Sequence, residues 1–514
     1  MRFKQHFFKN KKEKEQNLIS SNEATKLLNQ TYLSTEENIS YIKQTFSNAD
    51  DMVIKEIKTE KQQGVIVYLE TMADKEKIHK YVITPIIQAE DETIESFLVS
   101  EFQTSTDLNK AIEALITGSC VIFLDDFQHF FFLEVSMSNN RAVMEPENEM
   151  VIQGSHEGFI ENLLININLI RKEIKSPDLC LHYVSVGEKV KSKIAVVYMK
   201  KLANEEVIQE IKLRIGSIST DTLINTGFLE EFIEDSSFSP FPQILSTERI
   251  DRVIGNLNEG RAAILMEGCP TCLLAPVTFF AFYQSPDDYN SRWMPGTFVR
   301  ALRLVSFIIS IGLPAFYISV IAFNFEVLPD DLLLPVKNSI YKIPFPPLVE
   351  VFIMELTIEL IREAGIRLPS RIGQTIGIVG GLVIGDAIVR AGLISNVMIV
   401  VVALTAISSF VIPNHEMSAS VRLLRFPFMI LAASFGFVGM VFGFMVILSH
   451  LCKLESFGTP YFAPLAPFKL KDLKDTFLRL PAWTLNTRQS DSQPNKLKQQ
   501  SSSRGRIYHD RKRK

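Results

Sequence analysis

The chain has 514 residues, of which 54 are basic and 58 are acidic, and its formal net charge is −4. This length predicts about three structural units. The near-neutral charge averages two unlike parts, because residues 1–296 are rich in charged side chains and residues 297–451 are mostly apolar. The composition therefore excludes a single soluble domain, and the averaged charge says little about partners.

Residues 1–27 are predicted to be a flexible, charged head. Lysines dominate Met1–Glu15 and no apolar stretch follows them, so we expect no signal peptide and a cytoplasmic location for the soluble half. The cysteines are odd in number and scattered, which is typical of unpaired thiols in a reducing compartment. They are Cys120, Cys180, Cys269, Cys272 and Cys452.

Residues 28–150 are expected to form a first α+β subdomain, in which helices and short strands are mixed. Apolar residues recur there at helical spacing and in short β-rich runs. The predicted helices are Asn22–Lys58, Asp74–Tyr81 and Ala111–Leu115, and the predicted strands are Gly64–Leu69, Cys120–Leu124 and Phe130–Val135. A polar, acidic stretch at Asn139–Glu149 is the expected linker to the next subdomain.

Residues 151–296 are expected to form a second α+β subdomain. The predicted helices are Glu157–Ile174 and Glu205–Ile215, and the predicted strands are Lys193–Tyr198 and Arg261–Met266. Because this pattern is ordinary and lacks active-site motifs, we interpret the soluble half as a module for signal relay and assembly.

Residues 297–451 predict an all-α, polytopic transmembrane domain of four or five helices, because apolar segments of about 20 residues can span a bilayer. Arg300 and Arg303 precede the first segment and place the soluble half in the cytoplasm, and Arg422 and Arg425 indicate a cytoplasmic loop before the last one. The candidate spans are Leu304–Phe325, Pro344–Ile361, Ile372–Val389, Gly392–Ile412 and Phe426–Leu451.

Residues 452–514 form a polar tail with a basic end, and their composition is typical of a disordered segment. Five full crossings would leave this tail outside the cell, whereas its positive charge favours the inside. Two explanations stay open. Either one segment is re-entrant or interfacial, or the tail lies outside the cell despite its positive charge.

Four glycines, Gly373, Gly377, Gly381 and Gly385, recur every four residues and would form one smooth face of a helix. Helix backbones in lipid approach closely along such a face. The face fits tight packing within one subunit, and it also fits packing against other copies of the chain around a pore. These residues are the candidate packing or pore helix.

Three carboxylates, Glu355, Glu359 and Glu363, recur at the same spacing and share one helical face. Charges inside a bilayer usually face a cavity or a partner, so this face is a candidate acidic ion pathway. The alternative is an amphipathic helix at the membrane surface, with its acids solvated or paired to Arg362 and Arg367.

A CxxC pair, Cys269 and Cys272, superficially matches half of a zinc site or a redox motif. Zinc requires four ligands, and no second CxxC or nearby His pair exists in the sequence. Phosphate-binding loops, dinucleotide-binding turns and nucleophile elbows are also absent from it. We therefore predict no enzymatic activity, no cofactor and no metal site.

Several short stretches together resemble one known family. In Gly154–Lys172 a turn leads into an Asn-containing helix with a basic end, and Phe241–Asp251 reads FPQILSTERID. These motifs, over about residues 110–470, resemble the A subunits of GerA-family spore germination receptors. His156 and Ile250 depart from the family pattern, which puts any role of those two positions in doubt. Further matches are Glu259–Arg261, Gly268–Pro270 and Ser285–Tyr289 with Arg300 and Arg303.

The resemblance implies a nutrient receptor in the inner membrane of a bacterial endospore. It implies that the A subunit works with a transporter-like B subunit and a lipoprotein C subunit to release ions. It further implies self-association into a homo-oligomeric, ligand-gated cation channel in the lipid bilayer. No nucleic-acid partner is expected, because the basic tail is interpreted as a solvated segment near the membrane. The alternative is a secondary transporter or a transporter accessory subunit, although the spans show no evident internal repeat.

Overall fold

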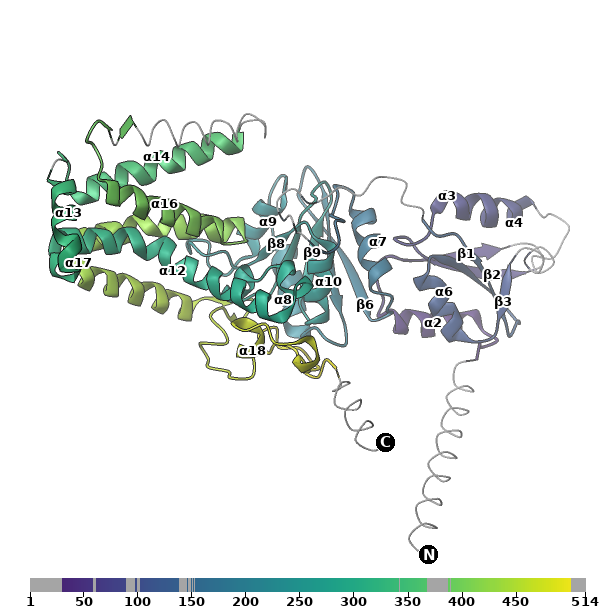
Figure 1. Cartoon of the computed structure of the whole chain (residues 1–514). Coiled ribbons are helices and arrows are strands. Elements are labelled where there is room, and N and C mark those ends of the chain that lie inside the picture. The colour runs from purple at the N-terminus through teal and green to yellow at the C-terminus, as the bar shows by residue number, and fades with distance from the viewer. Residues whose placement is uncertain are drawn as a thin grey trace, which may run out of the picture. The chain divides into compact units, whose positions relative to one another are not determined.

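The computed structural model describes residues 30–58, 62–88, 102–137, 153–341, 343–367 and 390–500, with a few isolated residues between these ranges. The chain divides into two compact units, whose elements are labelled in Figure 1. The predicted head, residues 1–27, lies outside the described residues, as does most of the predicted linker. The α+β unit comprises Met1–Asn148, His156–Phe232 and Thr247–Leu273, and the helical unit comprises Glu149–Ser155, Ile233–Ser246 and Leu274–Lys514.

The first sheet of the α+β unit has five strands in the order β1-β2-β4-β5-β3. Its helices pack on both faces, so the central strands are buried on both sides. Because side chains alternate along a strand, Val65 and Val67 join one core while Ile66 and Tyr68 join the other. The strands are β1 (Met52–Lys58), β2 (Gln63–Leu69), β3 (Gln103–Ser105), β4 (Ser119–Leu124) and β5 (Phe130–Glu134), and the helices are α2 (Thr35–Thr45), α3 (Lys75–Ile78), the π-helical turn η1 (His79–Ile83), α4 (Thr84–Gln88) and α6 (Leu108–Ile116).

The second sheet also has five strands, in the order β6-β7-β9-β10-β8. Strand β7, which lies between β6 and β9, reads SKIAVVYM and is buried over its last six residues, which explains its unbroken apolar run. The strands are β6 (Leu179–Val186), β7 (Ser192–Met199), β8 (Leu245–Thr247), β9 (Ala262–Met266) and β10 (Cys272–Ala275), and the helices are α7 (Leu163–Glu173), α8 (Glu205–Gly216), α9 (Thr226–Ile233) and α10 (Ile250–Asn258).

The two sheets repeat one pattern. Each set of elements opens with a helix and two antiparallel strands, and later adds a strand, a helix and two final strands in the same spatial order. A side-chain contact repeats as well. The Asn38 amide group bonds both backbone groups of Tyr32, and the Asn166 amide group does the same with Ile160. The α+β unit is therefore an internal duplication.

Most elements predicted for this unit are confirmed, including β2, β4, β5, β7, β9, α6 and α8. The predicted helix Asn22–Lys58 is wrong at its end, because Met52–Lys58 pairs antiparallel with β2 as strand β1. The predicted helix Glu157–Ile174 begins only at Leu163, where the Asn162 side chain accepts a hydrogen bond from a backbone N–H of the first turn. The sequence does not predict β1, β3, β6, β8 and β10.

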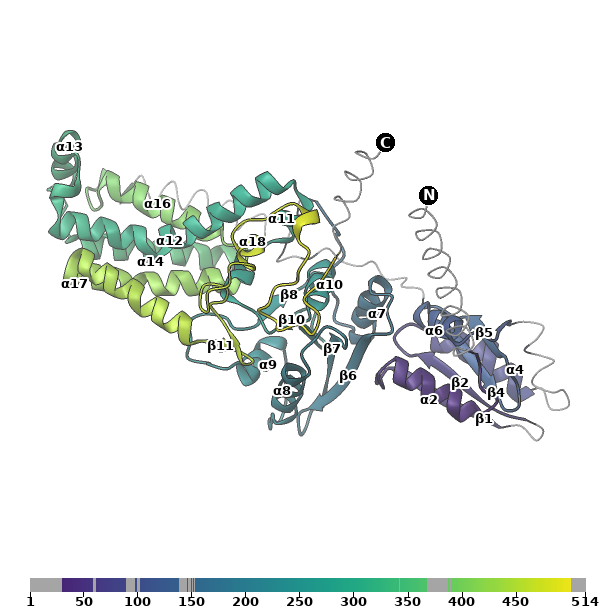
Figure 2. The same cartoon turned by 90° about the horizontal axis from the view of Figure 1, so that it is seen from below.

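Among its described residues, the helical unit contains four long helices, which are labelled in Figure 2. They are α12 (Trp293–Phe323), α14 (Pro347–Arg367), α16 (Asn396–Phe410) and α17 (His415–Lys453). The shorter elements are η2 (Phe279–Tyr283), α11 (Pro286–Asn290), η3 (Phe325–Val327), α13 (Asp330–Ile340), β11 (Glu455–Ser456), β12 (Thr459–Pro460), α18 (Leu473–Thr476) and η4 (Ala482–Thr484).

Within the described part of the chain, α12 and α17 are long and apolar enough to cross a membrane, judged by length and composition. They coincide with the first and last predicted spans. α14 carries more charges than α12 and α17, and α16 is shorter at 15 residues, so a domain of four or five crossings remains a prediction. The predicted span Ile372–Val389 lies almost wholly outside the described residues.

The expectation of disorder after Cys452 is wrong for residues 454–500, which fold within the helical unit. Tyr461 is fully buried, and its hydroxyl donates a hydrogen bond to the Pro242 carbonyl at 2.6 Å. The Tyr461 carbonyl accepts another from the backbone N–H of Phe279 at 2.8 Å. The polar average of the tail conceals this aromatic anchor, and Figure 2 shows the folded tail in yellow.

Candidate functional site: buried ion pairs in the helical unit

Helix α14 turns two of its carboxylates into the helical unit and many of its apolar side chains outward. It begins at Pro347, a residue that suits the first turn of a helix because its missing N–H has no partner there anyway. Glu350 and Glu355 are buried, although both are acidic. The exposed side chains of α14 include Phe352, Ile353, Leu356, Leu360 and Ile366. This is the reverse of a helix in water and suits a helix surrounded by lipid.

An ion pair between Glu355 and Arg425 joins α14 to α17 at the centre of this site. Glu355 is 0% exposed and Arg425 is 2% exposed. The Arg425 guanidinium donates to Glu355 Oε2, and it also donates to the Ser310 carbonyl of α12 at 2.8 Å and to Ser310 Oγ at 3.1 Å. One arginine therefore connects three helices.

A second group of charges lies further along α14. The Arg422 Nε atom is 3.2 Å from Glu359 Oε1, and the Arg362 Nη1 atom is 3.5 Å from the same oxygen. Arg362 also donates to Ser409 Oγ at 2.9 Å and lies over the Phe410 ring, 4.4 Å from its centroid. Glu359 therefore receives positive charge from α17 and from its own helix.

The third predicted carboxylate, Glu363, forms a different kind of pair. It contacts Arg367 within the same helix, at 2.6 Å from Nη2, and the two side chains are 59% and 76% exposed. The structure thus places all three predicted acids on α14 and gives each an arginine partner, as the alternative in the sequence interpretation allowed for Arg362 and Arg367. Their role in an ion pathway remains a hypothesis.

Contacts along these helices also fix their directions. Glu350 accepts from Ser395 N, and Ser395 Oγ lies 3.0 Å from the Tyr317 hydroxyl near the far part of α12. Glu355 lies beside Ser310, nearer the start of α12. α14 therefore runs opposite to α12. Because α16 starts at Ser395 and ends beside Arg362, it runs in the same direction as α14.

The prediction that Arg422 and Arg425 lie in a loop before the last span is wrong, whereas the cytoplasmic side of the connection before α17 remains a prediction. Both residues lie within helix α17, because their charges are satisfied by α14 carboxylates and not by water. Sequence reasoning missed these two functional candidates. A signal was available in the sequence. Arg422 and Arg425 are about one helical turn apart, as are Glu355 and Glu359, so two neighbouring helices can pair both arginines with both carboxylates.

Helix α17 is interrupted at Gly436, whose φ of 59° and ψ of −138° are not helical. The chain reverses there, since Gly443 faces Phe428 and the Phe428 and Phe444 rings are 4.8 Å apart. A Cβ atom on Gly439 would lie 2.1 Å from the Leu431 carbonyl oxygen. α17 is therefore a hairpin of two closely packed helices. Its first half runs parallel to α12, because Arg425 binds Ser310 and Gly436 lies against Phe323.

The closely packed glycines of α17 are thus Gly436, Gly439 and Gly443, which the sequence interpretation did not single out. They have the same small-residue signal as the predicted face. That predicted face lies outside the described residues, so its role remains a prediction. It consists of Gly373, Gly377, Gly381 and Gly385.

A second cluster of buried charges surrounds the start of α12. Arg300 and Arg303 are buried and both bind the Asp288 carboxylate, Arg303 at 2.8 Å. Arg300 also binds Asp475 of the tail, whose Oδ1 and Oδ2 accept from the Tyr289 hydroxyl at 3.2 Å. Burial raises the pKa of the Asp475 carboxyl, while the Arg300 charge acts in the opposite direction.

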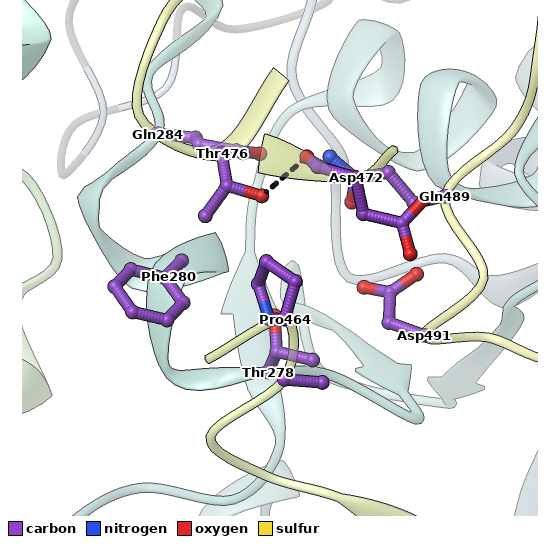
Figure 3. Close-up of a pocket in the computed structure, with 9 residues that line it drawn as sticks. Thr278, Phe280, Gln284, Pro464, Asp472, Thr476, Gln489 and Asp491 are labelled. Carbon is purple, nitrogen blue, oxygen red and sulfur yellow. Dashed lines mark hydrogen bonds between the residues drawn. The ribbon is translucent and has the colours of Figure 1, made fainter. Parts of the chain in front are cut away.

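A small hollow next to this cluster separates the tail from the segment before α12 (Figure 3). Its volume of about 10 Å³ is roughly the space of one water molecule. The Thr476 hydroxyl donates to the Asp472 carbonyl at 2.9 Å at its edge, and the Phe280 ring and Pro464 face each other across it. The hollow is too small for a nutrient, and we assign it to packing of the tail.

In the α+β unit, one buried ion pair joins the two repeats. Arg171 of the second repeat donates two hydrogen bonds of 2.8 Å to Asp51 of the first. Asp51 also accepts from the Thr71 hydroxyl at 2.5 Å, and the Asn168 amide donates to the Thr71 carbonyl at 2.6 Å. All four side chains are buried. Paired, geometrically complete contacts of this kind hold the repeats in one orientation.

The CxxC pair is structural. Cys272 begins strand β10 and both thiols are buried. Burial raises the pKa of Cys269 and of Cys272, which keeps both thiols protonated at neutral pH. Among the described residues, no group of three or more His, Cys, Asp or Glu side chains is placed to hold a metal ion.

Alkylation of the native protein at pH 8 is expected to modify Cys452 and to spare the other four cysteines. Cys452 is the exposed one, whereas burial raises the pKa of Cys120, for example, to about 12, so that the reactive thiolate is scarce. Mass spectrometry after a short iodoacetamide treatment measures this. A serine at Cys452 should abolish labelling, and fast modification of Cys269 or Cys272 would contradict the structural interpretation.

An α+β unit followed by a helical unit with two membrane-length helices and buried ion pairs is the architecture of a membrane-associated protein. A sequence profile of the family "Bacillus/Clostridium GerA spore germination protein" matches residues 40–491. The chain belongs to this GerA family, as its motifs indicated.

Two relatives match this chain over most of their own length. "Spore germination protein KA" of Bacillus subtilis is 37% identical over 479 residues, covering 91% of this chain and 88% of that protein. "Uncharacterized membrane protein YfkQ" of the same organism is 39% identical, covering 83% and 84%. A crystal structure of the N-terminal domain of the A subunit of the Bacillus megaterium spore germinant receptor GerK3 is 29% identical, with a TM-score of 0.38, and covers 49% of this chain and 98% of that one.

Proposed function

We propose that this chain is the A subunit of a nutrient receptor in the spore inner membrane, and that it converts nutrient binding into cation release. Its partners would be a transporter-like B subunit, a lipoprotein C subunit and further copies of itself around a pore. Family membership supports the receptor role. The observation that carries the membrane part is the inverted amphipathicity of α14, with buried Glu355 and exposed Leu356 and Leu360.

The helix directions support an even number of crossings. α12, α14, α16 and the two halves of α17 supply five passes through the layer. Because α14 and α16 run in the same direction, the chain has to return once between them, and five plus one gives six. An even number places the C-terminal tail on the side of the α+β unit. In this proposal the basic tail lies inside the cell, as its charge favours, and no re-entrant segment is needed.

Replacing Glu359 with glutamine is expected to slow potassium release from spores by about tenfold, the lower end of what focused charge does to ion capture. In a symmetric oligomer the change removes one charge from every subunit at once. Because the Glu363 carboxylate is exposed and paired within its own helix, it is left out of the proposed pathway, and Glu363→Gln is the matched control. Flame photometry after nutrient addition, at equal receptor abundance, gives the rates. Equal rates for both variants and the parent would reject the acidic pathway.

Single-channel recording of the purified, reconstituted complex separates a channel from the alternative of a secondary transporter. A channel gives unitary currents that begin on addition of nutrient, whereas a transporter gives only slow, saturable uptake.

A further inference from the structure

The described tail carries apolar and basic side chains on its surface, beside the start of α12. Leu465, Phe468, Leu470, Leu478 and Trp483 are exposed, with Phe468 at 64% and Leu470 at 72%. Lys469, Lys471 and Lys474 lie among them in the sequence. We name this stretch, Leu465–Trp483, the tail ramp. We propose that the tail ramp binds the surface of a membrane that contains anionic phospholipids.

The position of the tail ramp is fixed by contacts within the helical unit. The Arg479 guanidinium donates to the Tyr289 carbonyl at 3.0 Å, and the Thr297 hydroxyl donates to the Arg479 carbonyl at 2.9 Å. Asp475 pairs with Arg300 and its carbonyl accepts from Gln284 at 3.1 Å. The ramp is therefore held against the first turns of α12.

Those first turns lie where a membrane boundary would fall. Arg303 is the last charged residue before the apolar stretch of α12, and cations collect at this boundary. The exposed residues Met294, Phe298, Leu302 and Val305 are spaced by four, four and three positions and form one face. This face continues into the apolar part of the helix, so the lipid-facing surface reaches the level at which the tail is attached.

The acidic side chains of the tail ramp bind partners within the fold and do not neutralise its lysines. The Asp475 carboxylate pairs with Arg300 and accepts a hydrogen bond from the Tyr289 hydroxyl. The Asp472 carboxylate accepts hydrogen bonds from the backbone N–H and the hydroxyl of Ser490. Lys471 and Lys474 form no ion pair with the carboxylates that the structure describes. Exposed Phe, Leu and Trp side chains together with lysines that lack acidic partners are typical of a segment bound at the lipid headgroup layer. There the apolar side chains enter the bilayer surface and the lysines contact phosphate groups.

The two tryptophans of the chain allow a direct test, since Trp293 opens α12 and Trp483 closes the tail ramp. The full chain is reconstituted in vesicles of phosphatidylcholine with or without phosphatidylglycerol. In the Trp293→Phe variant, Trp483 should shift to shorter emission wavelengths and be quenched by brominated lipid when phosphatidylglycerol is present. Raising the salt concentration should reverse most of that change.

The double variant Lys471→Gln/Lys474→Gln should lose most of the response to phosphatidylglycerol. A matched control, Lys43→Gln/Lys110→Gln, removes two exposed lysines from the α+β unit and should keep it. Quenching of Trp483 by aqueous iodide with no effect of brominated lipid would overturn the proposal, as would contact of Trp483 with another protein copy in place of lipid.

The inference rests on α12 crossing the membrane, which belongs to the proposed function. The fluorescence of Trp293 distinguishes a failure of the tail proposal from a failure of this membrane placement. In the Trp483→Phe variant, Trp293 reports on the start of α12. If Trp293 is quenched by brominated lipid and Trp483 is not, only the tail proposal fails. If neither is quenched, the membrane placement of α12 fails with it.

Discussion

Replacing Arg425 with glutamine is expected to remove most of the protein from the membrane fraction. The change leaves the carboxylate of Glu355 without its arginine, although this side chain is 0% exposed. Breaking one partner of a buried pair typically costs about 3–5 kcal/mol. Since folded domains are stable by only about 5–15 kcal/mol, this loss is a large share of the total. Immunoblots of membrane fractions and thermal unfolding in detergent measure the effect.

Two further variants test whether the buried pair is responsible. Arg367→Gln breaks an exposed pair within α14, the helix of Glu355, and should change the free energy of unfolding by less than about 1 kcal/mol. The double variant Glu355→Gln/Arg425→Gln leaves no unpaired charge and should recover much of the lost abundance. If Arg425→Gln were as stable as Arg367→Gln, the proposed link between α14 and α17 would be wrong.

Replacing Gly439 with alanine is expected to disrupt the α17 hairpin. The added Cβ would lie 2.1 Å from the Leu431 carbonyl oxygen, which is a backbone atom and cannot rotate away. Overpacking of this kind costs about 1–3 kcal/mol. We expect a lower unfolding temperature and faster digestion of the detergent-solubilised protein by a protease.

Gly365→Ala is the matched control, because no neighbouring atom lies within 4 Å of the added Cβ. Alanine also favours a helix over glycine by about 1 kcal/mol, so this control should be neutral or slightly stabilising. Equal unfolding temperatures for the Gly439 and Gly365 variants would show that the two halves of α17 are not packed as the structure has them.

The sequence predicted the division into an α+β half and a helical half because each half has its own apolar pattern. Buried central strands such as β4 and β7 are continuous apolar runs, and they were predicted within one or two residues. The edge strand β1 carries Lys55 and Glu56 among its apolar residues, so its pattern resembles a helix until its partner strand is known.

The carboxylates of the candidate site were predicted from their spacing, but their partners were not. Arg422 and Arg425 are 63 and 70 residues away in the sequence from Glu359 and Glu355, and only the packing of α14 on α17 brings them together. The turn at Gly436 was missed for a related reason. An uncharged apolar stretch gives no sign of reversal when the turn contains one glycine and no polar loop.

The turn at Gly436 has a consequence for the biogenesis of the protein. A pair of crossing helices usually exposes a polar loop on the far side, which has to be moved through the membrane during synthesis. Here the residues around the turn, from Phe435 to Phe437, are apolar or glycine, so nothing hydrophilic needs to be translocated. In the proposed topology, the two halves of α17 enter the bilayer together as one hairpin after Lys453 has left the ribosome, while the charged ends of both halves, with Glu416 and Lys453, stay on the side of synthesis.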